Sequence, residues 1–260
     1  MNTKLLTGLI AATTTFTTLF GAVSAQAAPG PSVSEEQYNQ QYDGVSEELL
    51  RLDYDTWKDF NYLVNDETNN ISDSLTTVDL NTLRWEDGVE DVEVYFINEG
   101  ALFRNQLFFS TDGVNLENAE IVFDDVASPL SILAEEDGPL ALGQGKSLGS
   151  FEGDTFLEFF IKADGANPNR TSPLIFGFEP EDSSDGLQHL IGYEVGEYVL
   201  LGFEDIEGGG DLDYNDVVFA VKGVTGETAV DVPEPTTALG LGLLGGLGLL
   251  VKGKKKRHQG

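Results

Sequence analysis

Residues 198–221 have the sequence YVLLGFEDIEGGGDLDYNDVVFAV, which carries the strongest structural signal of this chain. Two apolar runs, 198–203 and 217–221, flank an acidic segment that contains three consecutive glycines. The second run is apolar at every position, which is typical of a central strand covered on both faces. Glycines allow a tight turn between two runs of strand length, so we expect a β-hairpin whose loop carries the acidic side chains.

Similar short apolar runs lie upstream, and each is closed by turn residues. They cover residues 92–97, 102–109, 119–123, 155–161, 174–178 and 188–193. Together with the hairpin they make eight strands, a pattern that predicts a mainly β fold. We expect a jelly-roll-like β-sandwich over residues 70–222, followed by a short linker at 223–231.

The segment before residue 70 lacks this strand pattern. Residues 29–43 are polar and are expected to form a flexible leader. Apolar residues then recur at helical spacing, at Leu50, Tyr54 and Trp57. We therefore predict that residues 28–69 are a leader and a helix, which starts after Ser46 as N-cap and ends before Asn65. This helix either covers one end of the domain or docks on a partner.

The N-terminal end has the composition of an export signal. Lys4 precedes an apolar, threonine-rich segment at 5–23, and small residues lead to a cleavage point after Ala27. This pattern predicts a signal peptide over residues 1–27. Cleavage two residues earlier is the alternative.

The C-terminal end combines an uncharged glycine- and leucine-rich segment, 236–251, with a basic cluster. As a helix this segment would be about 24 Å long, which is short for a permanent membrane span. Its glycines weaken helix formation further. We expect a hydrophobic sorting helix that anchors the chain in the inner membrane only transiently.

Residues 232–260 resemble the PEP-CTERM sorting signal of Gram-negative bacteria and cyanobacteria. Pro233, Glu234 and Pro235 precede the apolar segment and the basic end in the order of that signal. The resemblance implies that a membrane protease, exosortase, cuts near this motif and that the protein reaches the cell surface or the medium. An ordinary tail anchor is the alternative.

The charge of the chain restricts its partners. It has 45 acidic and 14 basic residues, a net charge of −31, and the segment between the two ends is more acidic still. Such a surface repels nucleic acid and attracts cations, so we expect no nucleic-acid partner. The chain has no cysteine, which excludes disulfides, thiolate catalysis and cysteine-ligated zinc.

The acidic loop has the donor pattern of a calcium site. Oxygen side chains alternate along it, and hairpin pairing would bring the acids that follow the first strand to the same end. So many carboxylates together are costly unless a cation lies among them. We predict calcium as cofactor, with the ligands Glu204, Asp205, Asp211, Asp213, Asn215 and Asp216. The loop is not an EF-hand, and a solvated acidic turn is the alternative.

The loop also carries a family resemblance. FEDIEGGGDLDYND at 203–216 resembles the signature that ends a bacterial domain of unknown function, number 4114. VYFINEGALFRNQL at 94–107 is similar to an opening segment found before that signature. The resemblance covers residues 92–222. It implies a secreted or surface protein whose acidic residues act as metal ligands or as catalytic groups.

Other polar residues are weaker candidates. Two acidic loops are either ordinary turns or further sources of ligands, namely Asp164 with Asn167 and Asn169, and Asp182 with Asp185. We expect His189 to be packed or on the surface rather than to act as a ligand or catalyst. Glu99 and Arg104 flank a turn and are expected to form an ion pair.

Three functions fit these features. We favour a non-enzymatic surface or matrix protein, stabilised by calcium, that binds exopolysaccharide or surface proteins. A glycan hydrolase or lyase could use Glu204 with Asp211 or Asp216 as paired carboxylates. The third function is a structural adhesin or layer component without a small ligand. The segment between the two ends contains no nucleophile elbow, histidine-based zinc motif or phosphate-binding loop.

Overall fold

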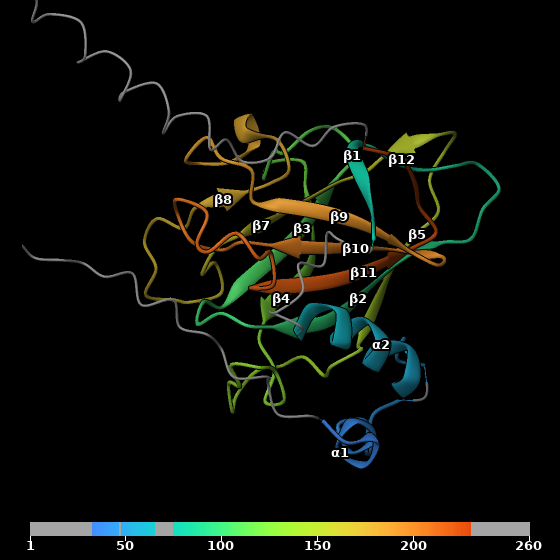
Figure 1. Cartoon of the computed structure of the whole chain (residues 1–260), viewed down its shortest axis with the longest axis vertical. Coiled ribbons are helices and arrows are strands. Elements are labelled where there is room, and N and C mark those ends of the chain that lie inside the picture. Colours follow the sequence, from blue (N-terminus) through green and yellow to red (C-terminus); the bar gives the residue numbers. More distant parts are fainter. Residues whose placement is uncertain (1–32, 47, 66–74, 230–260) are drawn as a thin grey trace, which may run out of the picture.

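A computed structural model describes residues 33–46, 48–65 and 75–229 (Figure 1). The predicted signal peptide with its cleavage at Ala27 and the sorting signal with Pro233, Glu234 and Pro235 lie outside these residues. Within the described ranges, no helix is both long and apolar enough to cross a membrane. The described fold is mainly β, as predicted, and is built from two antiparallel sheets.

The larger sheet has the strand order β12-β1-β9-β10-β11-β2-β5, and β6 pairs with β1. Its strands are β1 (Thr76–Trp85), β2 (Val92–Glu99), β5 (Gly145–Gly149), β6 (Thr155–Phe156), β9 (Leu190–Val195), β10 (Tyr198–Phe203), β11 (Val217–Lys222) and β12 (Thr225–Thr228). The predicted hairpin is present as β10 and β11, with Phe203 opposite Val217. Because β11 also pairs with β2, it is a central strand, which explains its continuous apolar run.

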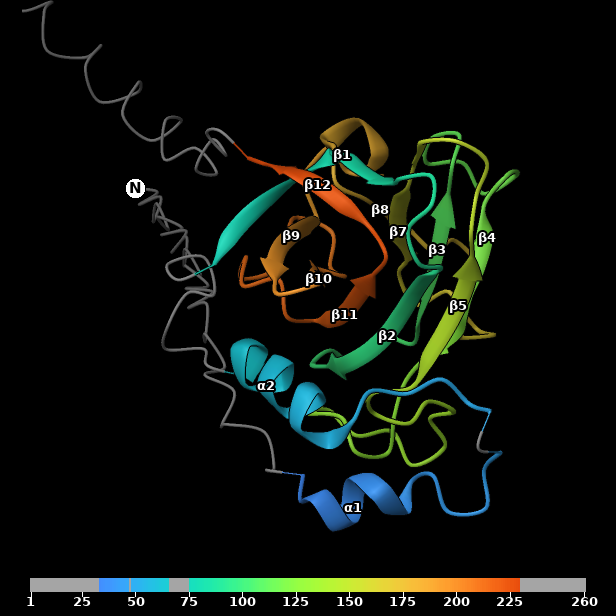
Figure 2. The same cartoon turned by 90° about the vertical axis from the view of Figure 1, so that its right-hand side faces the viewer.

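The smaller sheet has the strand order β4-β3-β7-β8. Its strands are β3 (Asn105–Ser110), β4 (Glu120–Val126), β7 (Glu158–Lys162) and β8 (Ile175–Phe176), and a short 3-10 helix, η2 (Pro180–Asp182), follows. Figure 2 shows the two sheets facing each other. They share one core, in which the ring of Phe123 from β4 stacks on that of Phe219 from β11, with centroids 5.9 Å apart.

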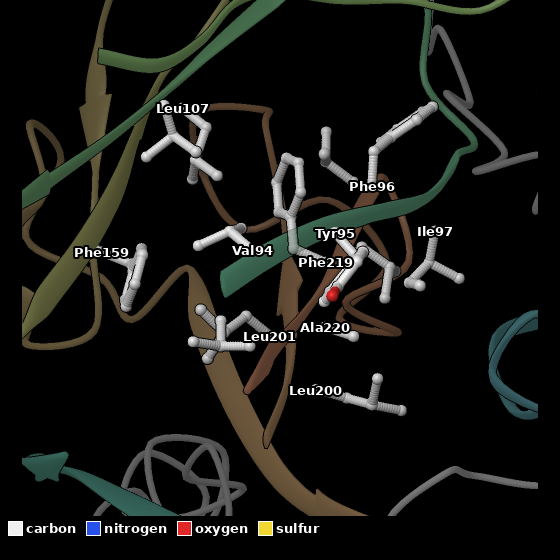
Figure 3. Close-up of a cluster of buried hydrophobic side chains, with 14 of the residues drawn as sticks. Val94, Tyr95, Phe96, Ile97, Leu107, Phe159, Leu200, Leu201, Phe219 and Ala220 are labelled. Atoms are coloured by element: carbon white, nitrogen blue, oxygen red, sulfur yellow. The ribbon is translucent and has the colours of Figure 1, made fainter. Parts of the chain in front are cut away.

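Figure 3 shows how both sheets contribute to this core. Leu107 and Phe159 extend from the smaller sheet toward Val94 and Leu201 of the larger one. Burial of such large side chains contributes about 1.5–3 kcal/mol each, so this core supplies most of the stability of a chain that has no disulfide.

Two helices precede the sheets: α2 (Tyr54–Asn65) packs beside the larger sheet, and α1 (Glu35–Gln40) packs against α2. The prediction of a flexible leader is wrong for α1. Ser34 caps this helix in a capping box with Gln37, and the buried hydroxyl of Tyr38 donates to the Leu52 carbonyl at 2.9 Å. These local and long-range contacts order a segment that composition alone marks as polar.

The predicted helix near residues 46–65 exists, but its start was placed too early. α2 begins at Tyr54, where the Asp53 carboxylate accepts a hydrogen bond from the Thr56 amide at 3.0 Å. The Ser46 hydroxyl instead accepts from the Glu48 amide in a turn. α2 covers the sheet near β2, because the Trp57 indole donates to the Ile97 carbonyl at 2.9 Å.

Three strands were not predicted, β1, β5 and β12. β1 contains a register irregularity between Asp79 and Arg84, which interrupts the alternation of buried and exposed residues. β12 lies within the predicted linker at 223–231, and this prediction is therefore wrong for residues 225–228. Thr228 lies opposite Val78, so the strand is ordered by pairing with β1 rather than by its own mostly exposed side chains.

Candidate metal centre

The loop that joins β10 to β11 leaves the larger sheet at one end, seen in orange in Figure 1. Glycines 208–210 all have positive φ angles, which favour glycine. Gly210 is also constrained by contact, because a Cβ atom there would lie 2.2 Å from Oε2 of Glu204. The glycine segment thus lets the loop backbone approach a carboxylate that comes from the end of β10.

Three acids converge in this loop, and we call Glu204, Asp211 and Asp213 the outer carboxylate group. Their ligand oxygens all lie within 4.8 Å of one another. Glu204 is fully buried, whereas Asp211 is exposed, so the group extends from the core to the surface. A small ion could reach it from solvent and contact a buried carboxylate.

The backbone of the loop fixes Glu204 but satisfies only part of its carboxylate. Oε1 accepts a hydrogen bond from the Tyr214 amide at 2.7 Å, and Oε2 is buried without a partner. Burial, followed by the charge of Asp216, raises the pKa of Glu204 to about 8. Burial and then Asp211 raise the pKa of Asp213 to about 6. Both shifts arise from burial and from neighbouring carboxylates, so negative charge in this group is not offset by a cationic side chain of the described residues.

Asn215 and Asp216 lie next to the outer carboxylate group. The side-chain amide of Asn215 donates to Oδ2 of Asp213 at 2.6 Å. Oδ2 of Asp216 accepts from the Asp205 backbone amide at 2.9 Å, and burial raises the pKa of Asp216. These contacts hold the two ends of the loop together. Asn215 and Asp216 therefore lie beside the outer carboxylate group without belonging to it.

Asp205 has different surroundings from the other predicted ligands. Its Oδ2 accepts a hydrogen bond at 2.7 Å from the amide of Asn105, which starts β3 of the smaller sheet. Its Oδ1 is buried without a partner. Burial, followed by Asp216, raises the pKa of Asp205 to about 8. The structure thus places the predicted ligands at two locations, one in the loop and one between the sheets.

Glu99 is a buried acid outside the predicted ligand set. It ends β2, is 1% exposed, and has a buried Oε2 without a partner. Burial and then Asp205 raise its pKa to about 9. The sequence signal was weak, because Glu99 follows the apolar run 94–97 after the polar residue Asn98, and only the structure shows that Glu99 is buried.

The predicted ion pair between Glu99 and Arg104 is not formed. Arg104 instead binds the carboxylates of Asp125 and Asp137, with an Nη1–Oδ1 distance of 2.9 Å to Asp137. Its guanidinium can remain partly in solvent there, whereas joining Glu99 would require burying a second charged group. Among the described residues, the ion pairs include no lysine or arginine bound to Glu99 or to the outer carboxylate group.

His189 is packed, which is one of its two predicted positions, and it supports the loop. Its ring is fully buried and stacks on Phe176 with centroids 3.8 Å apart. Nδ1 lies 2.9 Å from the Glu204 carbonyl, and Nε2 lies 3.0 Å from Oδ2 of Asp185. The same Asp185 oxygen accepts from the Gly208 amide at 2.8 Å. Asp185 therefore ties His189 to the glycine segment.

The remaining acidic loops form local contacts. Asp164, with φ at +54°, donates its amide to Asn105 and accepts from the Asn167 side chain at 3.1 Å. The Asn167 side chain in turn accepts from the Asn169 amide. Asp182 ends η2, and burial raises its pKa. These residues form turns, and none belongs to the outer carboxylate group.

Residues 151–224 match the model of a protein family described as a domain of unknown function, DUF4114. The match contains the whole acidic loop together with Asp185 and His189. It confirms the resemblance over this range, while the expected upstream part, 92–150, lies outside the match. No curated protein and no solved structure matches the chain.

The arrangement is better suited to binding a cation than to acting on a sugar ring. Glu204 is fully buried, and the backbone at Gly210 lies directly over its Oε2. A bulky substrate would have to displace the loop to reach this carboxylate, whereas an ion can enter between the side chains. The donors are oxygens only, which suits a hard cation.

Proposed function

We propose that this chain is an exported surface or extracellular-matrix protein whose fold is stabilised by calcium at the outer carboxylate group. One observation supports calcium most directly. Oε2 of Glu204 is buried without a hydrogen-bond partner, and oxygens of Asp211 and Asp213 lie within 4.8 Å of the Glu204 carboxylate. A cation there satisfies the unpartnered oxygen and offsets the repulsion among three carboxylates.

Calcium fits this group better than magnesium or zinc. Calcium takes six to eight oxygen ligands in flexible geometry, so loop carbonyls and water can complete its shell. Magnesium demands a stricter octahedron, and zinc sites generally include histidine or cysteine. Extracellular sites with dissociation constants of about 10⁻⁴ to 10⁻³ M are filled where calcium is abundant. A hundredfold excess over the dissociation constant stabilises the fold by roughly 2.7 kcal/mol.

The proposal includes export. The signal peptide over 1–27, exosortase cleavage near Pro233–Pro235 and transient membrane anchoring rest on the sequence patterns of the two ends. The acidic composition supports an extracellular protein that binds calcium, and it disfavours nucleic-acid partners. We propose a jelly-roll-like sandwich for the two antiparallel sheets, in which pairing of strands far apart in the chain leaves the acidic loop at one end.

The proposed molecular role is binding of exopolysaccharide or surface proteins without catalysis. Burial of Glu204 under the loop supports this over a carboxylate-dependent glycan hydrolase or lyase, since the weak catalytic candidates Glu204 and Asp216 are held by loop backbone. A structural adhesin or layer component differs from a glycan binder in one measurable respect. A purified adhesin or layer component would self-associate when calcium is added, whereas a glycan binder would stay monomeric.

A calcium titration tests the metal site. The full chain is freed of metal with a chelator, and its melting temperature is measured as calcium is added. We expect the melting temperature to rise, and Asp211→Asn with Asp213→Asn to reduce the rise. Asp59→Asn with Asp87→Asn is the matched control, because it removes the same charge from exposed positions. Equal rises in both double variants and the parent would contradict the proposal.

A further inference from the structure

Two buried acids, Glu99 and Asp205, meet at the end of the fold that carries the outer carboxylate group. β11 lies between β10 and β2, and both Phe203 and Glu99 are opposite Val217 in the register. Asp216, directly before β11, links the two acids: its carbonyl accepts from the Gly100 amide next to Glu99, and its Oδ2 accepts from the Asp205 amide, each at 2.9 Å. Asp205 also faces the smaller sheet, since its carboxylate accepts from Asn105 of β3.

Neither of these carboxylates is fully satisfied by the protein. Each is 1% exposed, and each has one carboxylate oxygen, Oε2 of Glu99 and Oδ1 of Asp205, that is buried without a hydrogen-bond partner. In the described ranges, no ion pair reaches either residue, and the nearby Arg104 binds Asp125 and Asp137 instead. Buried carboxylates in natural proteins are usually paired with a cationic side chain or coordinate a metal. Since no ion pair to Glu99 or Asp205 is found among the described residues, a bound cation is the expected partner.

We propose that Glu99 and Asp205 bind a second calcium ion between the two sheets, separate from the ion at the outer carboxylate group. The two unpartnered oxygens supply ligands from opposite sides of β11, and water with nearby amide and carbonyl oxygens completes the shell. This ion joins the end of β2 to the end of β10. Through the hydrogen bond from Asn105 it also links the larger sheet to the smaller one.

The inner site uses different carboxylates from the outer one. Glu99 and Asp205 are absent from the converging group of Glu204, Asp211 and Asp213. The alternative occupant is a proton, which would make one or both acids neutral and leave them indifferent to calcium. The number of calcium ions bound per chain distinguishes the two occupants.

The experiment counts calcium ions by calorimetric titration of the full, metal-free chain at pH 7.5. We expect two ions in the parent, one in Glu99→Gln and one in Asp211→Asn with Asp213→Asn. Glu158→Gln is the matched control. Glu158 also has a buried oxygen without a partner, but it lies in β7 away from this end, and its replacement should leave two ions. Circular dichroism confirms that each variant is folded.

Each outcome decides the proposal. An unchanged ion count in Glu99→Gln would overturn it, as would a single ion in the parent that disappears with Asp211→Asn and Asp213→Asn. If Glu99→Gln and a second variant, Asp205→Asn, both fail to fold, the number of ions bound by the Asp211→Asn and Asp213→Asn double variant decides. One remaining ion supports the inner site and none refutes it. If that double variant keeps two ions while Glu99→Gln keeps one, the inner site stands and the outer site fails.

Discussion

Gly210 is the residue whose small size most directly shapes the outer carboxylate group. Its φ angle is +54°, and a Cβ atom would lie 2.2 Å from Oε2 of Glu204. Both observations restrict this position to glycine, although a positive φ alone costs only about 1–2 kcal/mol for other residues. The clash therefore acts on the metal ligand, in addition to the strain on the backbone.

We predict that Gly210→Ala weakens calcium binding and destabilises the chain by more than about 2 kcal/mol, since alanine adds both strain and a clash. Gly208→Ala is the control, because its φ is +93° and a Cβ atom there would meet nothing within 4 Å. It should lose stability but largely retain calcium affinity. Urea unfolding and calcium titration measure both quantities. Equal affinities in the two variants would contradict this assignment.

The buried carboxyl groups also predict how stability changes with pH. The pKa values of Glu204 and Asp205 are raised to about 8, and that of Glu99 to about 9, mainly by burial. In the unfolded chain these groups have pKa values of about 4. The folded state therefore binds more protons between these values, so the calcium-free chain is most stable near pH 4 and loses stability as pH rises toward 9.

The expected slope is about 1.4 kcal/mol per pH unit for each group that is ionised only in the unfolded state. Saturating calcium should flatten this dependence, because the ion favours the charged carboxylates in the folded state. Unfolding between pH 5 and 9, with and without calcium, measures both curves. Calcium-free protein that gains stability with rising pH would show that the buried acids are not neutral in the fold.

Among the secondary-structure elements, the turn before β9 supports the acidic loop. Asp185 accepts hydrogen bonds from the Gly208 amide and contacts His189, which in turn lies against the Glu204 carbonyl. Burial raises the pKa of Asp185, but the Gly208 amide and His189 outweigh burial and lower it. This charged acceptor therefore connects the strand β9 to the glycine segment without being a ligand.

We predict that Asp185→Ala leaves the β fold intact but weakens calcium binding by roughly 1–3 kcal/mol, because the loop loses a charged hydrogen-bond acceptor. Asp112→Ala removes an exposed acid elsewhere and should leave the affinity unchanged. Calorimetric titration measures the affinity, and circular dichroism reports the fold. The prediction fails if the Asp185 variant binds calcium as tightly as the Asp112 variant.

Trp57 is the most deeply buried side chain that α2 packs against the larger sheet, and Phe60 adds an edge contact with Tyr198 of β10. Trp57 is 1% exposed, stacks on Tyr38 with centroids 5.0 Å apart, and donates to the Ile97 carbonyl. We predict that Trp57→Ala costs about 3–5 kcal/mol, whereas Trp57→Phe, which keeps the ring but loses the donor, costs about 1–3 kcal/mol. Urea unfolding compares the two. Similar small losses would mean that α2 contributes little to the fold.

For the molecule as a whole, the acidic composition and the sequence of the two ends predict a processed, exported form. Mass spectrometry of protein recovered from the culture medium should find a new N-terminus near Ala28 and no basic tail. The expected C-terminus lies near Pro233–Pro235, because the resemblance implies exosortase cleavage there. Recovery of material that still contains Arg257 would contradict this processing.

Local sequence patterns were sufficient for part of the fold. The strand at 198–203 and the apolar run at 217–221 correspond to β10 and β11, because side-chain periodicity and glycine turns depend on neighbouring residues alone. β12 and α1 were missed for the opposite reason. Thr228 is ordered by pairing with Val78, and Tyr38 by its contact with Leu52, partners that local periodicity does not specify.

The same distinction applies to the candidate site. The acidic, glycine-rich loop after β10 was predictable because its acids and glycines are contiguous in the chain. Which carboxylates converge follows instead from the folded arrangement, in which Glu99 lies opposite Val217 and is linked to Asp205 through Asp216, while Arg104 binds Asp125. The physical reason is that strand register and burial, which set the position and charge cost of each carboxylate, arise from contacts between residues distant in the chain.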